Sequence, residues 1–537
     1  MFSIFFILLS AAAVEAGIAW GECNDLPDTM PSTMQCANFS VPLDYTTGYS
    51  NQSLTLQLAR LPAAVQPARG SILLNFGGPG ATARASLGSL SSTLMVMSGM
   101  EHDLVAFDPR GTGNTIPIRC HDDLGLLQQA FELIPTNASD TALGSVWARG
   151  TLDAQECYEA SRETGSLVGT AFVARDLMEV VDGLEGDGML RYWGFSYGTT
   201  LGATVAAMFP ERIDKIILDG VQNPHEYYHD VADFEEWFDS DKVVSGIFQT
   251  CVALPENCAL AQDGVSAEIL EEQFWDLLYR LKYEPVVVGR FKVDYVLLKA
   301  VVSQSLYDSA AWPATALLLR GLFNGEATSD MESIIAAFYP ITIEDVLDQA
   351  GLIAGRSGIH CSDNIPRAES LDAMLPAVER LYDISRFMGD VVTGAQLICS
   401  QWRFAAKERY TGDFHVTTAN PMLIVSTQLD AHTPLRSAYN VSSGFEGSRV
   451  LEVEGYGHSS LAVPSLCTID KISAYFNNGT LPEHGFACEA SAQPYSGIGW
   501  DDIINAGAER KRGTTSSRIG GYVIPRSYAP ARHAMHI

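Results

Sequence analysis

The stretch LRYWGFSYGTT at residues 190–200 carries the strongest structural signal of the sequence. An apolar run that favours a strand leads into a G-x-S-x-G motif centred on Ser196, and small residues that can open a helix follow. A serine on such a sharp turn projects from the edge of a sheet, and glycines on either side avoid collisions across the turn. The pattern therefore predicts Ser196 as a nucleophile, with an ordinary turn as the alternative.

A serine hydroxyl needs a base to take its proton and a carboxylate to orient that base. On this kind of turn the chain order is serine, acid, histidine. Asp430 follows a short β run at 421–426, and His458 follows the next run at 450–454. We therefore predict Asp430 as the acid and His458 as the base. The alternatives that stay open are Asp219 and Asp363 for the acid, and His432 and His484 for the base.

Hydrolysis also requires donors for the oxyanion. The run SILLNFGGPG at 71–80 places glycines at the end of a predicted strand, where backbone N–H groups are unobstructed. We expect the oxyanion hole to form from Gly77, Gly78 and Tyr197, chiefly from the amides of the last two. A plain turn is the alternative for this loop.

Short apolar runs alternate with helical stretches from residue 54 to 219, which is typical of a mostly parallel α/β sheet. Strands are expected at 71–76, 104–107, 190–194 and 215–218. Residues 225–400 are rich in helix formers and aromatics without strand alternation, which indicates an inserted helical cap. The predicted divisions are a signal peptide (1–16), a core in two parts (17–224 and 401–495), the cap (225–400) and a flexible basic tail (496–537). A processing signal at Lys511–Arg512 is the functional alternative for the tail.

The charge balance excludes one class of function. The chain has 34 Lys and Arg against 64 Asp and Glu, a net charge of −30. A polyanion needs a basic face, so a nucleic-acid partner is not expected. With 47% hydrophobic residues the chain has enough apolar material for a large core.

Several features predict export of the chain. The apolar run at 1–16 ends in small residues suited to signal cleavage and is too short to span a bilayer, and no later segment approaches a membrane span. The ten cysteines permit five disulfides, of which Cys251–Cys258 is the easiest local pair, with Cys361–Cys399 and Cys467–Cys488 as plausible neighbours. Glycosylation sequons occur at Asn38, Asn51, Asn137, Asn440 and Asn478.

One motif points to different chemistry. His225, Glu226 and His229 fit the H-E-x-x-H pattern of zinc metallopeptidases. No third ligand is obvious nearby, and the serine motif already accounts for the strand ends. A zinc peptidase therefore remains a remote alternative, and no cofactor or metal is expected.

In combination these motifs resemble the secreted α/β-hydrolase serine peptidases with a tripeptidyl-aminopeptidase-like carboxyl-terminal region, relatives of proline iminopeptidases. The resemblance runs in blocks over 76–488. Its blocks are 75–80, 103–113 with Cys120, 194–198, 218–224, 430–434, 455–458 with Cys467, and 479–485 with Cys488. Phe76 departs from the small or polar residue often found before the glycines. The resemblance implies an α/β-hydrolase fold, with a mostly parallel sheet, flanking helices and a cap, and an activity on peptides.

The predicted function is that of a secreted serine hydrolase, an aminopeptidase that releases amino acids or short peptides from peptide amino termini through an acyl-enzyme. Such an enzyme needs a carboxylate for the substrate's ammonium group. The acids considered first for that role are Asp363, Glu226, Glu235 and Glu236. The same acid-rich stretch of the cap also offers Asp230, Asp233, Asp239 and Asp241. The alternatives are a carboxylesterase or lipase with the same triad, or a non-catalytic binding protein of this fold.

Overall fold

The computed structural model describes residues 17–47, 52–121, 135–184, 186–339 and 343–514. Its centre is a nine-stranded sheet in the order β1-β2-β4-β3-β5-β6-β9-β10-β11. From β4 to β11 all neighbours are parallel, whereas β1 pairs antiparallel with β2, and β2 with β4. The strands are β1 (Gln35–Pro42), β2 (Ser53–Leu61), β3 (Ser71–Asn75), β4 (Asp103–Phe107), β5 (Leu190–Ser196), β6 (Ile213–Val221), β9 (Leu423–Leu429), β10 (Arg449–Tyr456) and β11 (Ala487–Cys488).

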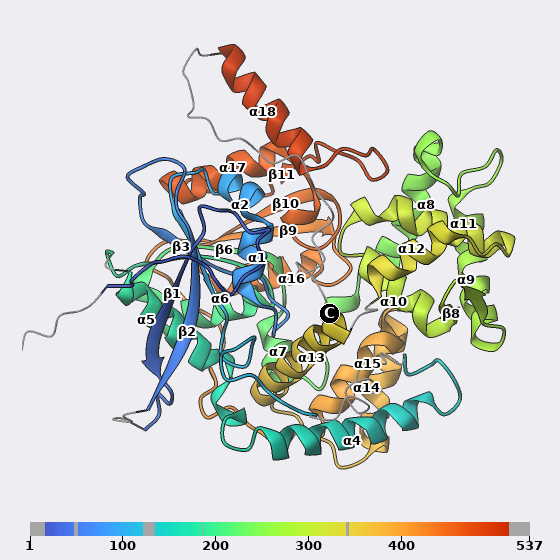
Figure 1. The fold of residues 1–537 in the computed structure, drawn as a ribbon, viewed down its shortest axis with the longest axis horizontal. Coiled ribbons are helices and arrows are strands. Elements are labelled where there is room, and N and C mark those ends of the chain that lie inside the picture. The colour runs from blue at the N-terminus through green and yellow to red at the C-terminus, as the bar shows by residue number, and fades with distance from the viewer. Residues whose placement is uncertain (1–16, 48–51, 122–134, 185, 340–342, 515–537) are drawn as a thin grey trace, which may run out of the picture.

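Helices cover both faces of this sheet, as Figure 1 shows. One face packs in a single hydrophobic cluster with α5 (Thr170–Gly183), α6 (Tyr197–Met208) and α16 (Leu435–Gly444). The other face packs against α1 (Ala83–Ser89), α2 (Ser91–Met97) and α17 (Leu466–Asn478). The central strands are buried on both faces, which explains why they read as continuous apolar runs. The predicted α/β-hydrolase fold is confirmed.

Between β6 and β9 the chain forms a second lobe around its own core (Figure 1). Its helices are α7 (Pro224–His229), α8 (Ser240–Ala253), α9 (Ala267–Tyr283), α10 (Tyr295–Ser305), α11 (Trp312–Asn324), α12 (Ser329–Phe338), α13 (Ile343–Asp363), α14 (Leu371–Ile384) and α15 (Gly389–Cys399). The lobe also holds a hairpin of β7 (Val286–Val288) and β8 (Phe291–Val293), which the sequence did not predict.

Helix α4 (Ala142–Ala160) departs from the division drawn from the sequence. It lies between β4 and β5 along the chain, yet it packs against α15 of the cap. A cluster of Cys157, Cys361, Cys399 and Trp402 joins this helix to the cap segment. Helix α4 therefore packs on the lobe that the chain forms between β6 and β9.

The carboxyl-terminal part differs from the predicted flexible tail over its first residues. Helix α18 (Trp500–Thr514) occupies part of 496–537. Ile503 and Ile504 are buried, and Trp500 Nε1 donates to the carbonyl of Leu461 (2.6 Å), so an apolar edge anchors this segment. The rest of the tail and the predicted signal peptide at 1–16 lie outside the described residues.

The structure pairs all ten cysteines. The three predicted pairs, Cys251–Cys258, Cys361–Cys399 and Cys467–Cys488, are confirmed. Cys23–Cys36 and Cys120–Cys157 complete the set.

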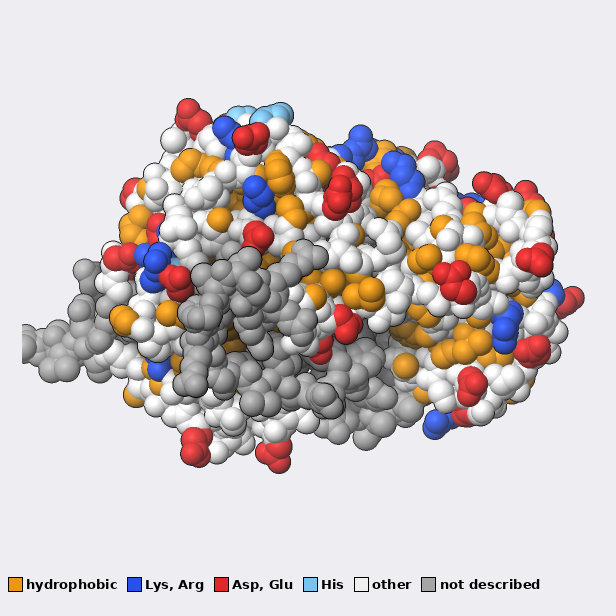
Figure 2. Space-filling model, turned by 90° about the horizontal axis from the view of Figure 1, so that it is seen from above, with side chains coloured by type: hydrophobic (Ala, Val, Ile, Leu, Met, Phe, Trp, Pro, Cys, Tyr) orange, Lys and Arg blue, Asp and Glu red, His pale blue; other side chains and the backbone are white. Residues whose placement is uncertain are grey.

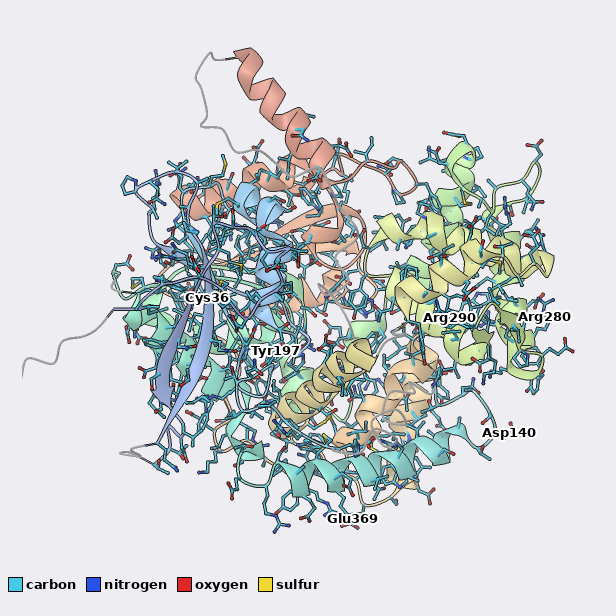
Figure 3. All side chains as sticks on the ribbon, viewed as in Figure 1. Cys36, Asp140, Tyr197, Arg280, Arg290 and Glu369 are labelled. Atoms are coloured by element: carbon cyan, nitrogen blue, oxygen red, sulfur yellow. A yellow bond between two sulfur atoms is a disulfide. The ribbon has the colours of Figure 1, made fainter. Side chains whose placement is uncertain are left out.

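Two further views describe the surface and the centre of the molecule. On the face in Figure 2, acidic side chains are scattered among basic and apolar ones. Among the described residues, none of the helices has the length and apolar character needed to cross a bilayer. Figure 3 places Tyr197 on the side of the sheet that is nearest to the cap, whereas Arg280 lies at the far edge of the cap.

Candidate active site

Ser196 occupies the turn that the sequence predicts. It ends β5, immediately precedes α6, and has φ of +56°, a conformation that non-glycine residues seldom adopt. A Cβ at Gly194 would lie 2.2 Å from the carbonyl oxygen of Gly198, and one at Gly198 would lie 2.5 Å from that of Asn75. The two glycines are therefore required by close backbone contacts, and these contacts hold the serine in its strained conformation.

Asp430 and His458 meet at the ends of neighbouring parallel strands, β9 and β10. Nδ1 of His458 lies 2.9 Å from Oδ2 and 3.1 Å from Oδ1 of Asp430. Burial alone would raise the pKa of Asp430, but His458 and the surrounding donors hold that pKa below its usual value. Nδ1 therefore donates to an ionised carboxylate, which leaves Nε2 as the basic nitrogen.

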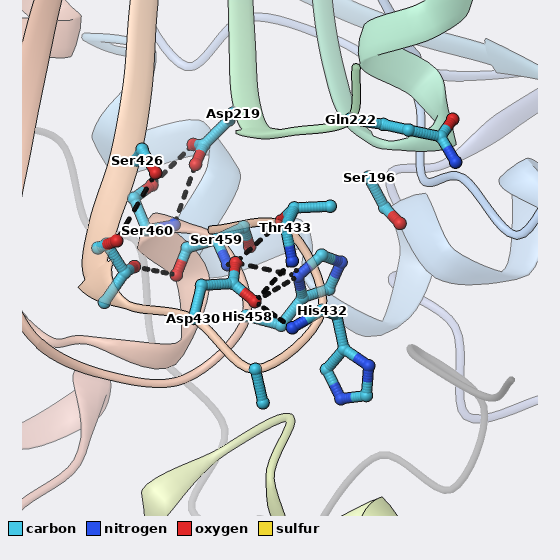
Figure 4. Close-up of polar contacts among 12 residues, drawn as sticks. Ser196, Asp219, Gln222, Ser426, Asp430, His432, Thr433, His458, Ser459 and Ser460 are labelled. Atoms are coloured by element: carbon cyan, nitrogen blue, oxygen red, sulfur yellow. Dashed lines mark hydrogen bonds and ion pairs between the residues drawn. The ribbon is translucent and has the colours of Figure 1, made fainter. Parts of the chain in front are cut away.

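Ser196 and His458 line one pocket. One edge of the His458 ring contacts Asp430. Figure 4 shows that the opposite edge lies on the side of Ser196. Nε2 of His458 is buried and has no hydrogen-bond partner within the described part of the chain. In structures without substrate the serine–histidine bond is often long, so this geometry suits a base that engages the serine when substrate binds.

Neighbouring side chains fix the two loops that carry the acid and the base. Thr433 Oγ1 donates to Asp430 Oδ2 (2.8 Å) and lies 3.1 Å from His458 Nδ1. Asp219 accepts from the N–H and the hydroxyl of Ser460, two residues beyond His458, at 2.8 and 2.6 Å. Burial raises the pKa of Asp219 to about 6, against the opposing effect of these bonds. The alternative acid Asp219 thus anchors the histidine loop, and Asp430 contacts the imidazole itself.

The glycine loop after β3 lies directly against Ser196. A Cβ at Gly77 would come within 2.7 Å of Ser196 Cβ and 3.1 Å of the Tyr197 nitrogen. Gly77 donates its own N–H to Asn75 Oδ1 (3.0 Å), so it is not a free oxyanion donor as the sequence suggested. Tyr197 begins α6, so its N–H has no acceptor within the helix. Gly78 lines the pocket, and its amide and that of Tyr197 are the ones suited to an oxyanion.

Of Asp363, Glu226, Glu235 and Glu236, only Glu236 lines this pocket. Asp363 is fully buried elsewhere and accepts from Thr170 and Tyr227, and burial raises its pKa to about 7. Glu226 accepts the N–H of Glu235. The assignments of Asp363, Glu226 and Glu235 to the substrate site therefore need correction, because their carboxylates serve contacts within the protein or lie away from the pocket.

A second acid, Asp233, lines the pocket beside Glu236. Glu236 is 8% exposed and accepts from Gln222 Nε2 (2.5 Å), and Asp233 is 3% exposed and accepts from Gln396 Nε2 (3.2 Å). Burial, and next the charge of Asp233, raise the pKa of Glu236 well above its usual value. Because the charge of Asp233 disfavours ionisation of Glu236, a cation bound beside both carboxyls would stabilise the charged form of Glu236.

The H-E-x-x-H motif does not form a metal site. The ring of His225 packs edge-on against Phe414, and Glu226 is engaged by the backbone of Glu235. In the described residues, no three His, Cys, Asp or Glu side chains lie close enough to hold a metal ion. Among the described residues the motif therefore has no third ligand, and His225 and Glu226 make contacts within the protein instead.

Sequence reasoning did not single out several residues of the pocket. Arg356 and His360 come from one face of α13, Tyr307 from the loop after α10, and Trp237 from the turn that carries Glu236. The spacing of Arg356 and His360 by four residues in a helix was a usable signal that both face the same side.

Comparisons with known proteins agree with this architecture. The family described as alpha/beta hydrolase fold matches residues 72–251, and the TAP-like protein family matches 385–488. The tripeptidyl aminopeptidase of Streptomyces lividans is 27% identical over 509 residues, 91% of this chain and 89% of the relative. The serine protease Hip1 of Mycobacterium tuberculosis is 24% identical, over 88% of this chain and 91% of the relative. Carboxylesterase B of Mycobacterium tuberculosis is 27% identical, over 88% and 89%.

The fold and these relatives define a serine hydrolase of the α/β-hydrolase class. The chain is similar to tripeptidyl aminopeptidases over most of its length, and its residues 385–488 match the TAP-like protein family.

Proposed function

We propose that the protein is an exported aminopeptidase that releases short peptides from the free amino termini of its substrates, with Ser196, His458 and Asp430 as catalytic residues. His458 Nε2 takes the proton of Ser196 Oγ, which attacks the carbonyl, while the amides of Gly78 and Tyr197 stabilise the oxyanion. His458 then protonates the leaving amine, and water hydrolyses the acyl-enzyme.

The observation that carries the exopeptidase assignment is the pair of buried carboxyls in the same pocket as the nucleophile. An ammonium group placed between Asp233 and Glu236 would relieve their mutual repulsion and offset their desolvation. A peptide with a blocked amino terminus brings no such charge. We therefore expect recognition of the free ammonium to depend on these two residues.

The test compares tripeptidyl p-nitroanilides with free and acetylated amino termini. We expect wild-type protein to prefer the free substrate, and Glu236→Gln and Asp233→Asn to lose at least ~10-fold of that preference. Glu235→Gln is the matched control, since its carboxyl is next in sequence but outside the pocket. Equal cleavage of free and acetylated substrates by the wild type would overturn the assignment.

An esterase is the second candidate, because one relative is named as a carboxylesterase. The same serine chemistry hydrolyses esters. Rapid hydrolysis of p-nitrophenyl butyrate with no cleavage of any tripeptidyl anilide would favour the esterase.

Export is supported by five disulfides and by exposed sequon asparagines. Asn38, Asn137, Asn440 and Asn478 are all exposed, whereas Asn51 lies outside the described residues. Disulfides persist in oxidising compartments, and glycans require accessible asparagines. Recovery of the mature chain from culture medium, beginning after residue 16, tests this part of the proposal.

A further inference from the structure

A second histidine of the pocket, His432, has an unsatisfied ring. Its side chain is 4% exposed and lines the pocket with Ser196 and His458. Neither ring nitrogen has a hydrogen-bond partner among the described residues. Its backbone N–H donates to Asp430 Oδ1 (2.8 Å), so the residue is fixed to the carboxylate that orients His458.

Aromatic neighbours hold the ring of His432 on several sides. It stacks on Tyr307 with centroids 3.8 Å apart, and it meets Trp237 edge to face at 6.0 Å. It also lies edge to face with His458, at 5.5 Å (Figure 4). These contacts restrict the side chain of His432, so its ring, with both nitrogens unpaired, stays in the wall of the pocket.

The neighbours also locate this ring relative to the substrate. His458 is the base of the proposed mechanism, and Trp237 directly follows Glu236, part of the proposed ammonium site. The ring of His432 contacts both His458 and Trp237, so it lies between the reacting bond and the acidic residues of the cap. The part of a substrate between its scissile carbonyl and its ammonium group would pass this ring.

The ring is neutral under working conditions, because burial, and next the nearby His458, lower the pKa of His432 to about 3. A neutral imidazole offers one N–H donor and one acceptor nitrogen. Leaving both unpaired in a buried position is unfavourable, and a peptide unit offers the complementary C=O and N–H.

We infer that His432 binds a backbone peptide unit of the acyl part of the substrate, between the free amino terminus and the scissile carbonyl. This inference rests on the proposed aminopeptidase function and specifies its substrate class. Such a subsite favours released fragments of at least two residues, because a single aminoacyl group has no peptide unit for His432 to bind. His432 is a specificity-determining residue for di- or tripeptide release.

The experiment measures kcat/KM for alanyl p-nitroanilide, for alanyl-alanyl-alanyl p-nitroanilide, and for the tripeptidyl analogue in which the amide next to the scissile bond is an ester. That ester removes one N–H from the substrate. For wild-type protein we expect the ester to lower kcat/KM by about 10-fold. His432→Phe keeps the stacking and removes both nitrogens, so it should cleave amide and ester equally.

Matched measurements separate substrate binding from damage to the catalytic site. His432→Phe should lower kcat/KM for the tripeptidyl anilide about 10-fold, mainly through KM, and leave alanyl p-nitroanilide within about two-fold. The pH profile of kcat should not move. His432→Asn provides a second variant, exposed His484→Phe is the control, and fluorophosphonate labelling counts folded active sites.

Equal losses on the single-residue and tripeptidyl anilides, or a wild type indifferent to the ester, would overturn the inference. If His432→Phe lost kcat/KM only with substrates that carry a peptide as the leaving group of the scissile bond, that result would also overturn the inference. Failure of the proposed function has a different signature, namely equal cleavage of free and acetylated substrates by the wild type.

Discussion

The hydrogen bonds around His458 make a specific prediction for the turnover of the Asp430→Asn variant. The Asp430 carboxylate accepts hydrogen bonds from its neighbours, at distances of 2.8–3.1 Å. The donors are the N–H groups of His432, Thr433 and Ser459, the Thr433 hydroxyl, and His458 Nδ1. Asparagine has the same shape but presents an NH2 group at one of the two oxygen positions.

If the new carbonyl keeps the N–H groups of His432 and Thr433, the NH2 group faces Nδ1 of His458. It can donate there only when Nδ1 carries no proton. The ring then holds its proton on Nε2 and cannot accept the proton of Ser196. In trypsin, where this exchange leaves the geometry intact, turnover falls about 10⁴-fold, and we expect a loss of that order. The N–H of Ser459 also loses its acceptor, which costs about 1–3 kcal/mol of stability.

The assay is kcat for a tripeptidyl p-nitroanilide, with thermal unfolding measured on the same samples. Asp413→Asn is the matched control, because Asp413 is exposed and remote from the site. A folded Asp430→Asn protein that kept more than about one hundredth of wild-type turnover would refute the tautomer argument.

Three further changes test separate parts of the account. Thr433→Val removes the hydroxyl that donates to Asp430 (2.8 Å), so kcat should fall about 10- to 100-fold with little change in KM, and Thr433→Ser should restore it; an unchanged kcat would contradict this. The pKa of Asp363 is about 7 in the folded protein and 3.8 in the unfolded chain, so the folded state holds this proton more tightly. The free energy of unfolding should therefore fall, by up to roughly 4 kcal/mol, as the pH rises from 3.8 to 7. Asp363→Asn should flatten that part of the pH dependence in denaturant unfolding, and an unaltered slope would show the assignment to be wrong. Chelator treatment and His225→Ala should each leave peptidase activity within about two-fold, and a loss restored by zinc would revive the metal hypothesis.

The nucleophile turn and the strands around it were predictable because their signals are local. Steric contacts among Gly194, Ser196 and Gly198 act within five residues, and parallel strands bring their carboxyl ends to one edge wherever they lie in the sequence. The antiparallel strand β2 was not predicted as a strand, although Leu54, Leu56 and Leu58 alternate with more exposed residues along it. That period of two was present in the sequence and could have identified it.

The substrate side of the pocket could not be predicted in the same way. Glu235 and Glu236 are adjacent in one short turn, yet of these two only Glu236 lines the pocket that holds Ser196. Arg356 and His360 reach the pocket from a helix more than 100 residues further along the chain. Packing of the cap on the sheet decides which side chains point inward, and no local pattern encodes that packing.

The role of Ser196 as nucleophile can be measured by reaction of the protein with a fluorophosphonate, followed by mass spectrometry of the labelled peptides and by tripeptidyl anilide hydrolysis. We expect one adduct, on Ser196, with activity lost in proportion to labelling, and neither adduct nor activity in Ser196→Ala. Full hydrolysis by protein whose Ser196 is completely labelled, or by Ser196→Ala, would contradict this role.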